Sequence, residues 1–344
     1  MSRYFRPIIQ SDCAKPENFY YLADQAYWFD KVEIIERGKE SLVVSAEEIP
    51  TEELKILTNS RSSQHANFPK KPSIMGILNV TPDSFSDGGE NFETLTAITA
   101  AETMMSEGAD IIDIGGESTR PGAKAVAAEL ELTRIEPVLS ALKNKNSNYQ
   151  ISVDTRKSGV IARAIELGVN FINDVSALSF DEHSRDVLAN HNVQVCLVHG
   201  GLNPEKMQEN MIYDDVLLDI YDYLKDRIDF AVAGGIKKEN IVVDPGIGFG
   251  KTISQNIRLI TKASLFHVLG CPILYGVSRK RFIGEIGKAP EARNRFPGSI
   301  AVAIELIRQG VHIIRVHDVK ETKQALDLWE ALVNRCDLKD GSSA

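Results

Sequence analysis

From Ser73 onward, short apolar runs alternate along the chain with longer amphipathic stretches. The runs are too short for buried helices and indicate buried strands. The predicted strands are Ile74–Leu78, Ile111–Ile114, Ile151–Val153, Phe171–Ile172, Val193–Val198, Ile241–Val243, Ile273–Gly276 and Ile313–Val316. The stretches between them predict helices at Phe92–Glu107, Ala125–Leu142, Ser158–Leu167, Glu182–Asn190, Asp214–Ala233, Gln255–Leu269, Ser299–Gln309 and Glu321–Val333. A glycine follows four of these helices, where a left-handed cap is favoured, at Gly108, Gly168, Gly270 and Gly310.

This alternation predicts an α/β protein. Eight strands and eight helices over about 265 residues favour a closed (β/α)8 barrel, a TIM barrel, over an open doubly wound sheet. The number of strands alone leaves the open sheet as an alternative. The expected boundaries are 1–70 for an N-terminal extension and linker, 71–335 for the barrel and 336–344 for a C-terminal tail.

The extension has a different pattern from the barrel. Tyr27–Ile35 and Ser41–Val44 predict two strands joined through Gly38. Thr51–Thr58 predicts a short helix with Thr51 as its cap. No residue of the extension carries an assignable chemistry, so we expect it to pack against the barrel.

Composition narrows the class of protein. The 344 residues include 48 acidic and 39 basic side chains, for a formal charge of −9, which argues against a general nucleic-acid or anionic-membrane surface. No apolar run is long enough to span a bilayer, and the N-terminus lacks a signal-peptide core. The four cysteines have no metal-type spacing, so we expect buried free thiols in a reducing compartment and a cytoplasmic protein.

Polar residues stand at the carboxyl end of every predicted strand, the end that builds the active site of such barrels. They are Asn79, Asp113, Asp154, Asn173 with Asp174, His199, Asp244, Ser278-Arg279-Lys280, and Arg315 with His317. Taken singly, Asn79 is more consistent with a turn residue than with a ligand. Asp113 and Asp174 are also candidates for buried partners of loop amides. Capping does not account for polar residues at all eight ends.

The chemistry of these residues separates into two halves. Asp154, Asn173 and Asp244 suit a flat, nitrogen-rich heterocycle, because a carboxylate accepts two parallel hydrogen bonds from an amidine-like edge. Cationic residues follow the last two strands, where barrels often bind anions. The run from Asp244 to Lys251 lacks the glycines of a P-loop or a dinucleotide-binding fingerprint, which excludes both readings.

Several motifs, in order, make the chain resemble the dihydropteroate synthase family. They are Asn79-Val-Thr-Pro-Asp-Ser-Phe-Ser-Asp-Gly-Gly89, Gly115-Gly-Glu-Ser-Thr-Arg-Pro-Gly-Ala123, Ser152-Val-Asp-Thr155, Ile172-Asn-Asp-Val-Ser176, Asp244-Pro-Gly-Ile-Gly-Phe-Gly-Lys251, Ser278-Arg-Lys280 and Arg315-Val-His-Asp318. The resemblance implies the condensation of 6-hydroxymethyl-7,8-dihydropterin diphosphate with 4-aminobenzoate, with Mg²⁺, in folate biosynthesis. It also implies a homodimer and sensitivity of the aminobenzoate pocket to sulfonamides.

The same resemblance implies a role for each matching residue. Asn79 would hold the metal. Asp154, Lys280, Arg315 and His317 would act in catalysis. The pterin diphosphate would be bound by Thr119, Asp154, Asn173, Asp244, Lys280, Arg315 and His317. The 4-aminobenzoate pocket would be formed by Phe85, Arg120, Pro121 and Phe249.

Three positions depart from the family pattern. Gly200 stands where Met is common, which predicts a more open wall of the pterin site, Arg281 stands where Ser is frequent, and Ala177 stands where Gly is usual. Two other functions compete with the synthase. A corrinoid-dependent methyltransferase would explain the pterin half of the site but not the anion half. A non-catalytic pterin-binding protein would be favoured if the anion-site residues were missing, and they are present.

Overall fold

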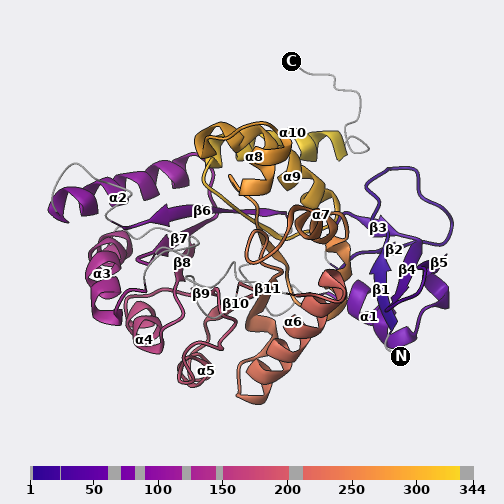
Figure 1. The fold of residues 1–344 in the computed structure, drawn as a ribbon, viewed down its shortest axis with the longest axis horizontal. Coiled ribbons are helices and arrows are strands. Elements are labelled where there is room, and N and C mark those ends of the chain that lie inside the picture. Colours follow the sequence, from indigo (N-terminus) through magenta and orange to yellow (C-terminus); the bar gives the residue numbers. More distant parts are fainter. Residues whose placement is uncertain are drawn as a thin grey trace, which may run out of the picture.

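Eight parallel strands form the centre of the computed structural model, which describes residues 3–23, 25–60, 71–81, 90–117, 125–144, 150–200 and 212–333 (Figure 1). The strands are β6 Ser73–Asn79, β7 Ile111–Gly115, β8 Gln150–Asp154, β9 Phe171–Asp174, β10 Gln194–Val198, β11 Ile241–Asp244, β12 Leu274–Gly276 and β13 Ile313–Val316. The helices that accompany them are α2 Glu90–Ser106, α3 Ala128–Asn144, α4 Ser158–Glu166, α5 Ser184–Ala189, α6 Val216–Ala233, α7 Ile253–Thr261, α8 Arg281–Ile286, α9 Phe296–Arg308 and α10 Val319–Val333.

The strands close into a barrel. They pair in the order β11-β10-β9-β8-β7-β6-β13-β12. The two ends of that series meet where Val243 of β11 bridges Ile273, and the Val243 amide donates to the Pro272 carbonyl at 3.0 Å. The (β/α)8 barrel is therefore confirmed, and the open sheet is excluded by a contact that the number of strands could not reveal.

The alternation of side chains along each strand determines which polar residues point into the barrel near its carboxyl end. Phe171, Val242 and Ile313 belong to an apolar cluster distinct from the larger core shared by sheet and helices. Two residues further along the same strands come Asn173, Asp244 and Arg315, which must point the same way because side chains in a strand repeat with period two. The apolar layer thus closes the floor beneath a polar layer at the carboxyl ends.

The N-terminal extension is a small antiparallel sheet. It consists of β1 Arg3–Pro7, β4 Lys31–Glu36 and β5 Leu42–Ser45, beside a two-stranded pair, β2 Tyr20–Tyr21 and β3 Trp28–Phe29, and the helix α1 Thr51–Thr58. The expected run at 27–35 is therefore two strands, while Gly38 makes the left-handed turn with φ +70°.

A partly buried group of ion pairs joins the extension to the barrel. Glu33 of β4 accepts from Arg6 at 2.5 Å and from Lys262 at 2.8 Å. The Ser264 hydroxyl donates to the Pro7 carbonyl at 2.8 Å. Lys262 and Ser264 lie at the start of the 3-10 helix Ala263–Leu269, which continues the chain after α7. The division of the chain into domains at residues 70 and 335 stays a prediction.

The structure corrects three local expectations. Pro50, rather than Thr51, occupies the cap position of α1, and Thr51 is its first helical residue. Helix α8 has no counterpart in the sequence pattern because its six residues are too few to show a helical period. Cys196 and Cys271 are buried free thiols, but Cys13 is disulfide-bonded, so the expectation of four free thiols is wrong.

The four predicted helix-capping glycines all have positive φ, between 73° and 103°. Within the described residues, no helix combines the length and apolarity needed to cross a bilayer.

Gly310 and Gly38 separate backbone strain from packing. Both have left-handed φ, +82° and +70°, but a Cβ on Gly310 would lie 2.6 Å from Leu22 Cδ2, whereas nothing lies within 4 Å of one on Gly38. We expect Gly38→Ala to lower the free energy of unfolding by about 1 kcal/mol. Gly310→Ala adds overpacking and should lower it by about 2–4 kcal/mol. Urea denaturation measures both, and equal losses would contradict the steric argument.

Candidate active site

A buried ion pair lies at the centre of the carboxyl face. Arg315 of β13 donates from Nε to Asp113 at 2.6 Å and from Nη2 to Asp154 at 2.8 Å. Asp113 also accepts from Ser152 Oγ at 2.6 Å and from Asn173 Nδ2 at 3.0 Å. Asp113, whose side chain is fully buried, is therefore the common partner that orients Asn173 and Arg315. Its partners are side chains rather than the loop amides that the sequence had suggested.

The charges in this group are unevenly matched. Burial raises the pKa of Asp154, and the Asp113 carboxylate raises it further, against the opposing charge of Arg315. The same carboxylates hold the pKa of Arg315 above its ordinary value against the effect of burial. Arg315 thus stays cationic, while Asp154 is a carboxylate for which additional hydrogen-bond donors would be favourable.

Asp174 supports the loop that follows β9. Its carboxylate accepts from the backbone amides of Ser176 at 2.8 Å and Leu178 at 2.9 Å, as expected of a buried partner of loop amides. Ala177 between them has φ +51°, a left-handed conformation that favours glycine. This explains why Gly is usual at that position in the family that the motifs resemble.

A buried lysine closes the glycine-rich loop after β11. Lys251 Nζ donates to the carbonyls of Gly246 at 2.7 Å and Phe249 at 3.0 Å, and lies 3.1 Å from His199 Nδ1. Burial lowers the pKa of Lys251 to about 7, and the nearby charge of Lys280 adds to this. The side chain therefore joins the loop after β11 to His199, the residue that follows β10.

Lys280 faces this loop from the other side of the barrel seam. Its Nζ lies 4.5 Å from the centre of the Phe249 ring, a cation–π distance. Burial lowers the pKa of Lys280 to about 8, and the charge of Arg315 acts in the same direction. Burial raises the pKa of Asp244 to about 6, although the Gly246 amide donates to it at 2.7 Å. Burial thus disfavours the charged forms of both Lys280 and Asp244. Groups with such shifted pKa values are candidates for binding a polar ligand.

His317 is a neutral donor in this site. Burial, with the charges of Arg279 and Arg315, lowers its pKa to about 3. Ser278 Oγ accepts from the His317 backbone amide at 3.1 Å and lies 3.0 Å from its Nδ1. A hydroxyl that accepts from the amide can donate to Nδ1, which leaves the ring proton on Nε2. Arg279, in turn, is held by a two-pronged pair with Asp318.

Among the strand-end residues of this site, one buried side-chain atom has no hydrogen-bond partner. Asn173 donates through Nδ2, but its Oδ1 lies buried without a hydrogen-bond partner. Buried polar atoms are nearly always satisfied, so this oxygen indicates a missing donor. With the carboxylates of Asp154 on the adjacent strand β8 and of Asp244 on β11, two strands away, this oxygen offers acceptors to a ligand rich in N–H groups.

The described residues supply little for a metal ion. They contain no group of three or more His, Cys, Asp or Glu side chains that could hold one. Asn79 ends β6, and its Oδ1 would lie 3.7 Å from a Cβ built on Gly115. One amide oxygen fits Mg²⁺ only when the remaining ligands come from water and substrate phosphates, which is the usual arrangement for that ion.

Four predicted site residues lie outside the described residues: Phe85, Thr119, Arg120 and Pro121. Of the departures, Gly200 does not open the wall of the site, because a Cβ there would lie 2.4 Å from Val175 Cγ2 and 2.6 Å from the Val175 carbonyl. Arg281 is exposed and pairs with Glu285 on its own helix at 2.5 Å. Its positive charge is therefore paired within helix α8.

Sequence reasoning missed the role of Lys251 and of a buried ionic cluster around Glu117. Lys251 appeared only as the last residue of a family motif and as the residue that stands where a dinucleotide-binding fingerprint needs glycine. A lysine directly after a glycine-rich loop is a usable signal, since its side chain is long enough to turn back onto loop carbonyls. No signal in the sequence links Glu117 to its partners, which come from another strand end and a helix.

The chain is similar to known proteins over most of its length. The model of the family described as pterin binding enzyme matches residues 75–317. Dihydropteroate synthase of Escherichia coli (strain K12) is 44% identical over 263 residues, which is 76% of this chain and 92% of that protein. The enzyme of Neisseria meningitidis serogroup C is 46% identical over 266 residues, with 76% and 93% covered.

Solved structures give the same result. Xanthomonas albilineans dihydropteroate synthase with 4-aminobenzoic acid superposes with a TM-score of 0.72 at 41% identity, covering 77% of this chain and 94% of that one. The Yersinia pestis enzyme in complex with a sulfonamide drug gives 0.71 at 42% identity, with 76% and 94% covered.

The charge on Lys280 should make the folded protein less stable. Its pKa falls from 10.5 to about 8 on folding, so the folded state disfavours the protonated form. The full shift corresponds to about 3 kcal/mol, and because the side chain keeps some contact with solvent, we expect Lys280→Met to stabilise the protein by about 1–2 kcal/mol at pH 7. Below pH 8 the gain is complete. It shrinks as pH rises towards 10.5, where the unfolded chain also loses the proton.

Urea denaturation of both proteins at pH 7 and pH 10 measures this difference. A gain of equal size at both pH values would show that it comes from packing of the methionine and not from the lysine charge.

Proposed function

Because the chain belongs to the pterin-binding enzymes, within the dihydropteroate synthases, we propose that it condenses 6-hydroxymethyl-7,8-dihydropterin diphosphate with 4-aminobenzoate in folate biosynthesis. The products are 7,8-dihydropteroate and diphosphate, which makes the protein a transferase. The observation that carries the proposal is the unpartnered, buried Asn173 Oδ1 at the end of β9, in a sheet whose strands β8 and β11 end in the buried carboxylates of Asp154 and Asp244. These three acceptors match the N–H groups of a pterin ring.

The reaction breaks a carbon–oxygen bond and forms a carbon–nitrogen bond. As diphosphate departs, positive charge develops on the pterin and its exocyclic carbon. The nitrogen lone pair of 4-aminobenzoate forms the new bond, and the ammonium that results loses a proton. Asp154 and Asp244 stabilise the cation by charge, in a buried setting where such interactions are strong. No side chain of the protein needs to act as a nucleophile.

Cationic and neutral donors act on the opposite half of the substrate. Lys280, whose pKa responds to the charges of both Asp244 and Arg315, would stabilise the departing anion by its charge. His317 is neutral and would donate a hydrogen bond to the diphosphate from Nε2. It carries no positive charge of its own. Arg315 is held between Asp113 and Asp154, which makes it the link between the two halves. Thr119 would complete the diphosphate contacts, and Phe85, Arg120, Pro121 and Phe249 the aminobenzoate pocket.

Mg²⁺ fits this reaction as an ion carried with the substrate. Asn79 would contribute one oxygen ligand. When bound, the ion would neutralise part of the diphosphate charge and improve it as a leaving group.

The competing functions explain fewer of the observations. A methyl transfer from a reduced folate would use the hydrogen-bond acceptors at the ends of β8, β9 and β11. It would not explain the cationic Lys280 and Arg315 beside a neutral His317. A binding protein without turnover would likewise not require those three residues. The cytoplasmic location proposed from the sequence is consistent with all three functions.

The deciding experiment is diphosphate release with Mg²⁺ and the pterin diphosphate, with and without 4-aminobenzoate. We expect release coupled to dihydropteroate formation, and competition between 4-aminobenzoate and sulfonamides. Lys280→Ala should reduce turnover by at least about 100-fold through loss of a charge at the reacting centre, with an unchanged circular dichroism spectrum. Lys237→Ala, an exposed lysine remote from the site, is the control. Tight pterin binding without release would instead identify a binding protein.

We also propose a homodimer. Apolar side chains are exposed on three helices at the same part of the barrel wall: Ile257 on α7, Ile286 on α8 and Phe296 on α9, with exposed fractions of 37%, 58% and 40%. Helix α9 contacts both of the others. Light scattering should give twice the chain mass, and Ile257→Glu should lower it towards the monomer by burying a charge. A wild-type monomer at micromolar concentration would reject the proposal.

A further inference from the structure

We propose that Glu117, Lys157 and Glu131 form a positioning cluster that fixes both ends of segment 118–124 and so determines the affinity for 4-aminobenzoate. The inference rests on the proposed function, because that segment carries Arg120 and Pro121 of the aminobenzoate pocket. None of the three residues belongs to the site described above.

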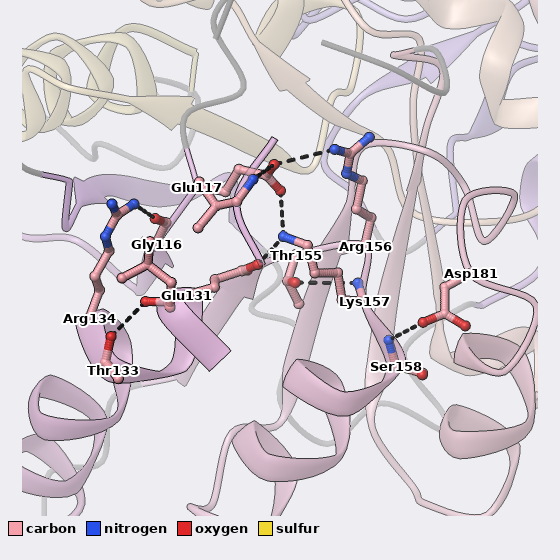
Figure 2. A network of polar contacts seen from close by, with 12 residues as sticks. Gly116, Glu117, Glu131, Thr133, Arg134, Thr155, Arg156, Lys157, Ser158 and Asp181 are labelled. Carbon is pink, nitrogen blue, oxygen red and sulfur yellow. Dashed lines mark hydrogen bonds and ion pairs between the residues drawn. The ribbon is translucent and has the colours of Figure 1, made fainter. Parts of the chain in front are cut away.

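The cluster joins three separate parts of the chain (Figure 2). Lys157, in the loop after β8, donates from Nζ to Glu117 Oε2 at 2.7 Å and also pairs with Glu131 of α3. Arg156 lies 3.3 Å from the other carboxylate oxygen of Glu117. Exposed fractions of the side chains are 5% for Glu117, 0% for Glu131 and 11% for Lys157. Such pairs are shielded from solvent and from salt.

A single carboxylate reaches both ends of the segment. Glu117 is the residue immediately before it, and its Oε1 accepts from the backbone amide of Val126 at 3.0 Å. Residues 117 and 126 are thereby held to each other and to Lys157. The positions from which the chain leaves and re-enters the barrel are thus set by one side chain, whatever path residues 118–124 take between them.

Helix α3 provides a second support at the same point. Arg134 Nη1 donates to the Gly116 carbonyl at 2.7 Å. A Cβ on Gly116 would lie 3.0 Å from the Glu131 carbonyl and 2.9 Å from Ile135 Cγ2, so the chain passes directly against the helix. Only glycine permits this approach. Helix α3 therefore holds the chain at Gly116, directly before Glu117.

The electrostatics favour the ionised form of Glu117. Burial alone would raise the pKa of Glu117, but hydrogen bonds from Lys157 and Val126, with the charges of Lys157 and Arg156, hold it below its ordinary value. Burial raises the pKa of Glu131 despite the charge of Lys157. Buried ion pairs contribute little net stability compared with apolar residues of the same shape, which favours a role in geometry. Lys157 is also only three residues after Asp154, so the base of the segment is tied to the pterin side of the site.

The test uses steady-state kinetics of the full chain with both substrates varied. Glu117→Gln keeps the shape but removes the charge. We expect a rise of about tenfold or more in the KM for 4-aminobenzoate, as for the loss of a charged hydrogen bond, with the KM for the pterin diphosphate within about twofold. Lys157→Met should likewise raise the KM for 4-aminobenzoate and leave the KM for the pterin diphosphate nearly unchanged. Lys157→Arg keeps the charge, so its KM for 4-aminobenzoate should be closer to that of the wild type. A loss of stability alone would lower kcat or the melting temperature without separating the two KM values.

Trypsin cleavage after Lys124, at the end of the segment, gives a readout independent of activity. Cleavage should be several-fold faster in Glu117→Gln than in wild type, as expected when a local contact is released. The matched control is Glu136→Gln, which breaks the pair between Glu136 of α3 and Arg163 of α4 on the surface of the same helix and should change neither measurement.

The two proposals fail in different ways. If the wild-type chain makes no dihydropteroate, the proposed function is wrong, and cleavage at Lys124 still tests the cluster. If the wild type is active and Glu117→Gln leaves both the 4-aminobenzoate KM and the cleavage rate unchanged, the positioning role is overturned. The same conclusion follows if both KM values rise by the same factor.

Discussion

The Asp113 carboxylate is the constraint on which the active-site face depends. It is fully buried at the centre of the barrel and accepts hydrogen bonds from Ser152, Asn173 and Arg315, which come from three different strands. Because the guanidinium it holds also binds Asp154, the acceptors for a ligand ring and the cation beside them share one reference point. A change in any of these strands is transmitted to all of the others, since a buried charge with a missing partner is costly.

Two polar layers can be distinguished above the apolar floor of the barrel. The central one, around Asp113, contains the residues that we propose to bind the substrates. The peripheral one, around Glu117 and Lys157, faces helix α3 and holds the chain where a loop departs. They meet along the strand end from Asp154 to Lys157, where residues of one short stretch serve both layers. This arrangement places ligand-binding groups on rigid strands and leaves their variation to the loops, the usual division of labour in such barrels.

The sequence was sufficient for the alternation of eight strands with helices and for the strand-end residues, because both follow from periodicity, and it favoured a closed barrel without excluding an open sheet. An apolar run and the polar residue that ends it are read directly from the chain. Pairings between distant residues could not be predicted: the bridge from Val243 to Ile273, the position of Arg315 between two carboxylates, and the turn of Lys251 back onto its own loop all depend on three-dimensional packing. Gly200 shows the same limit, since the missing side chain suggested open space and the backbone of Val175 fills it.

The contacts of the N-terminal extension have a consequence for synthesis of the protein on the ribosome. All strand pairs of its small sheet form within the first 45 residues, but Arg6 donates to Ser264, 258 positions later. At a translation rate of about 5–20 residues per second, the partner emerges roughly 10–50 s after the extension. The barrel, in turn, closes only when β13 is available to pair with β6. During that interval the extension is a separate part of the nascent chain. The barrel surface against which its sheet packs has not yet been synthesised.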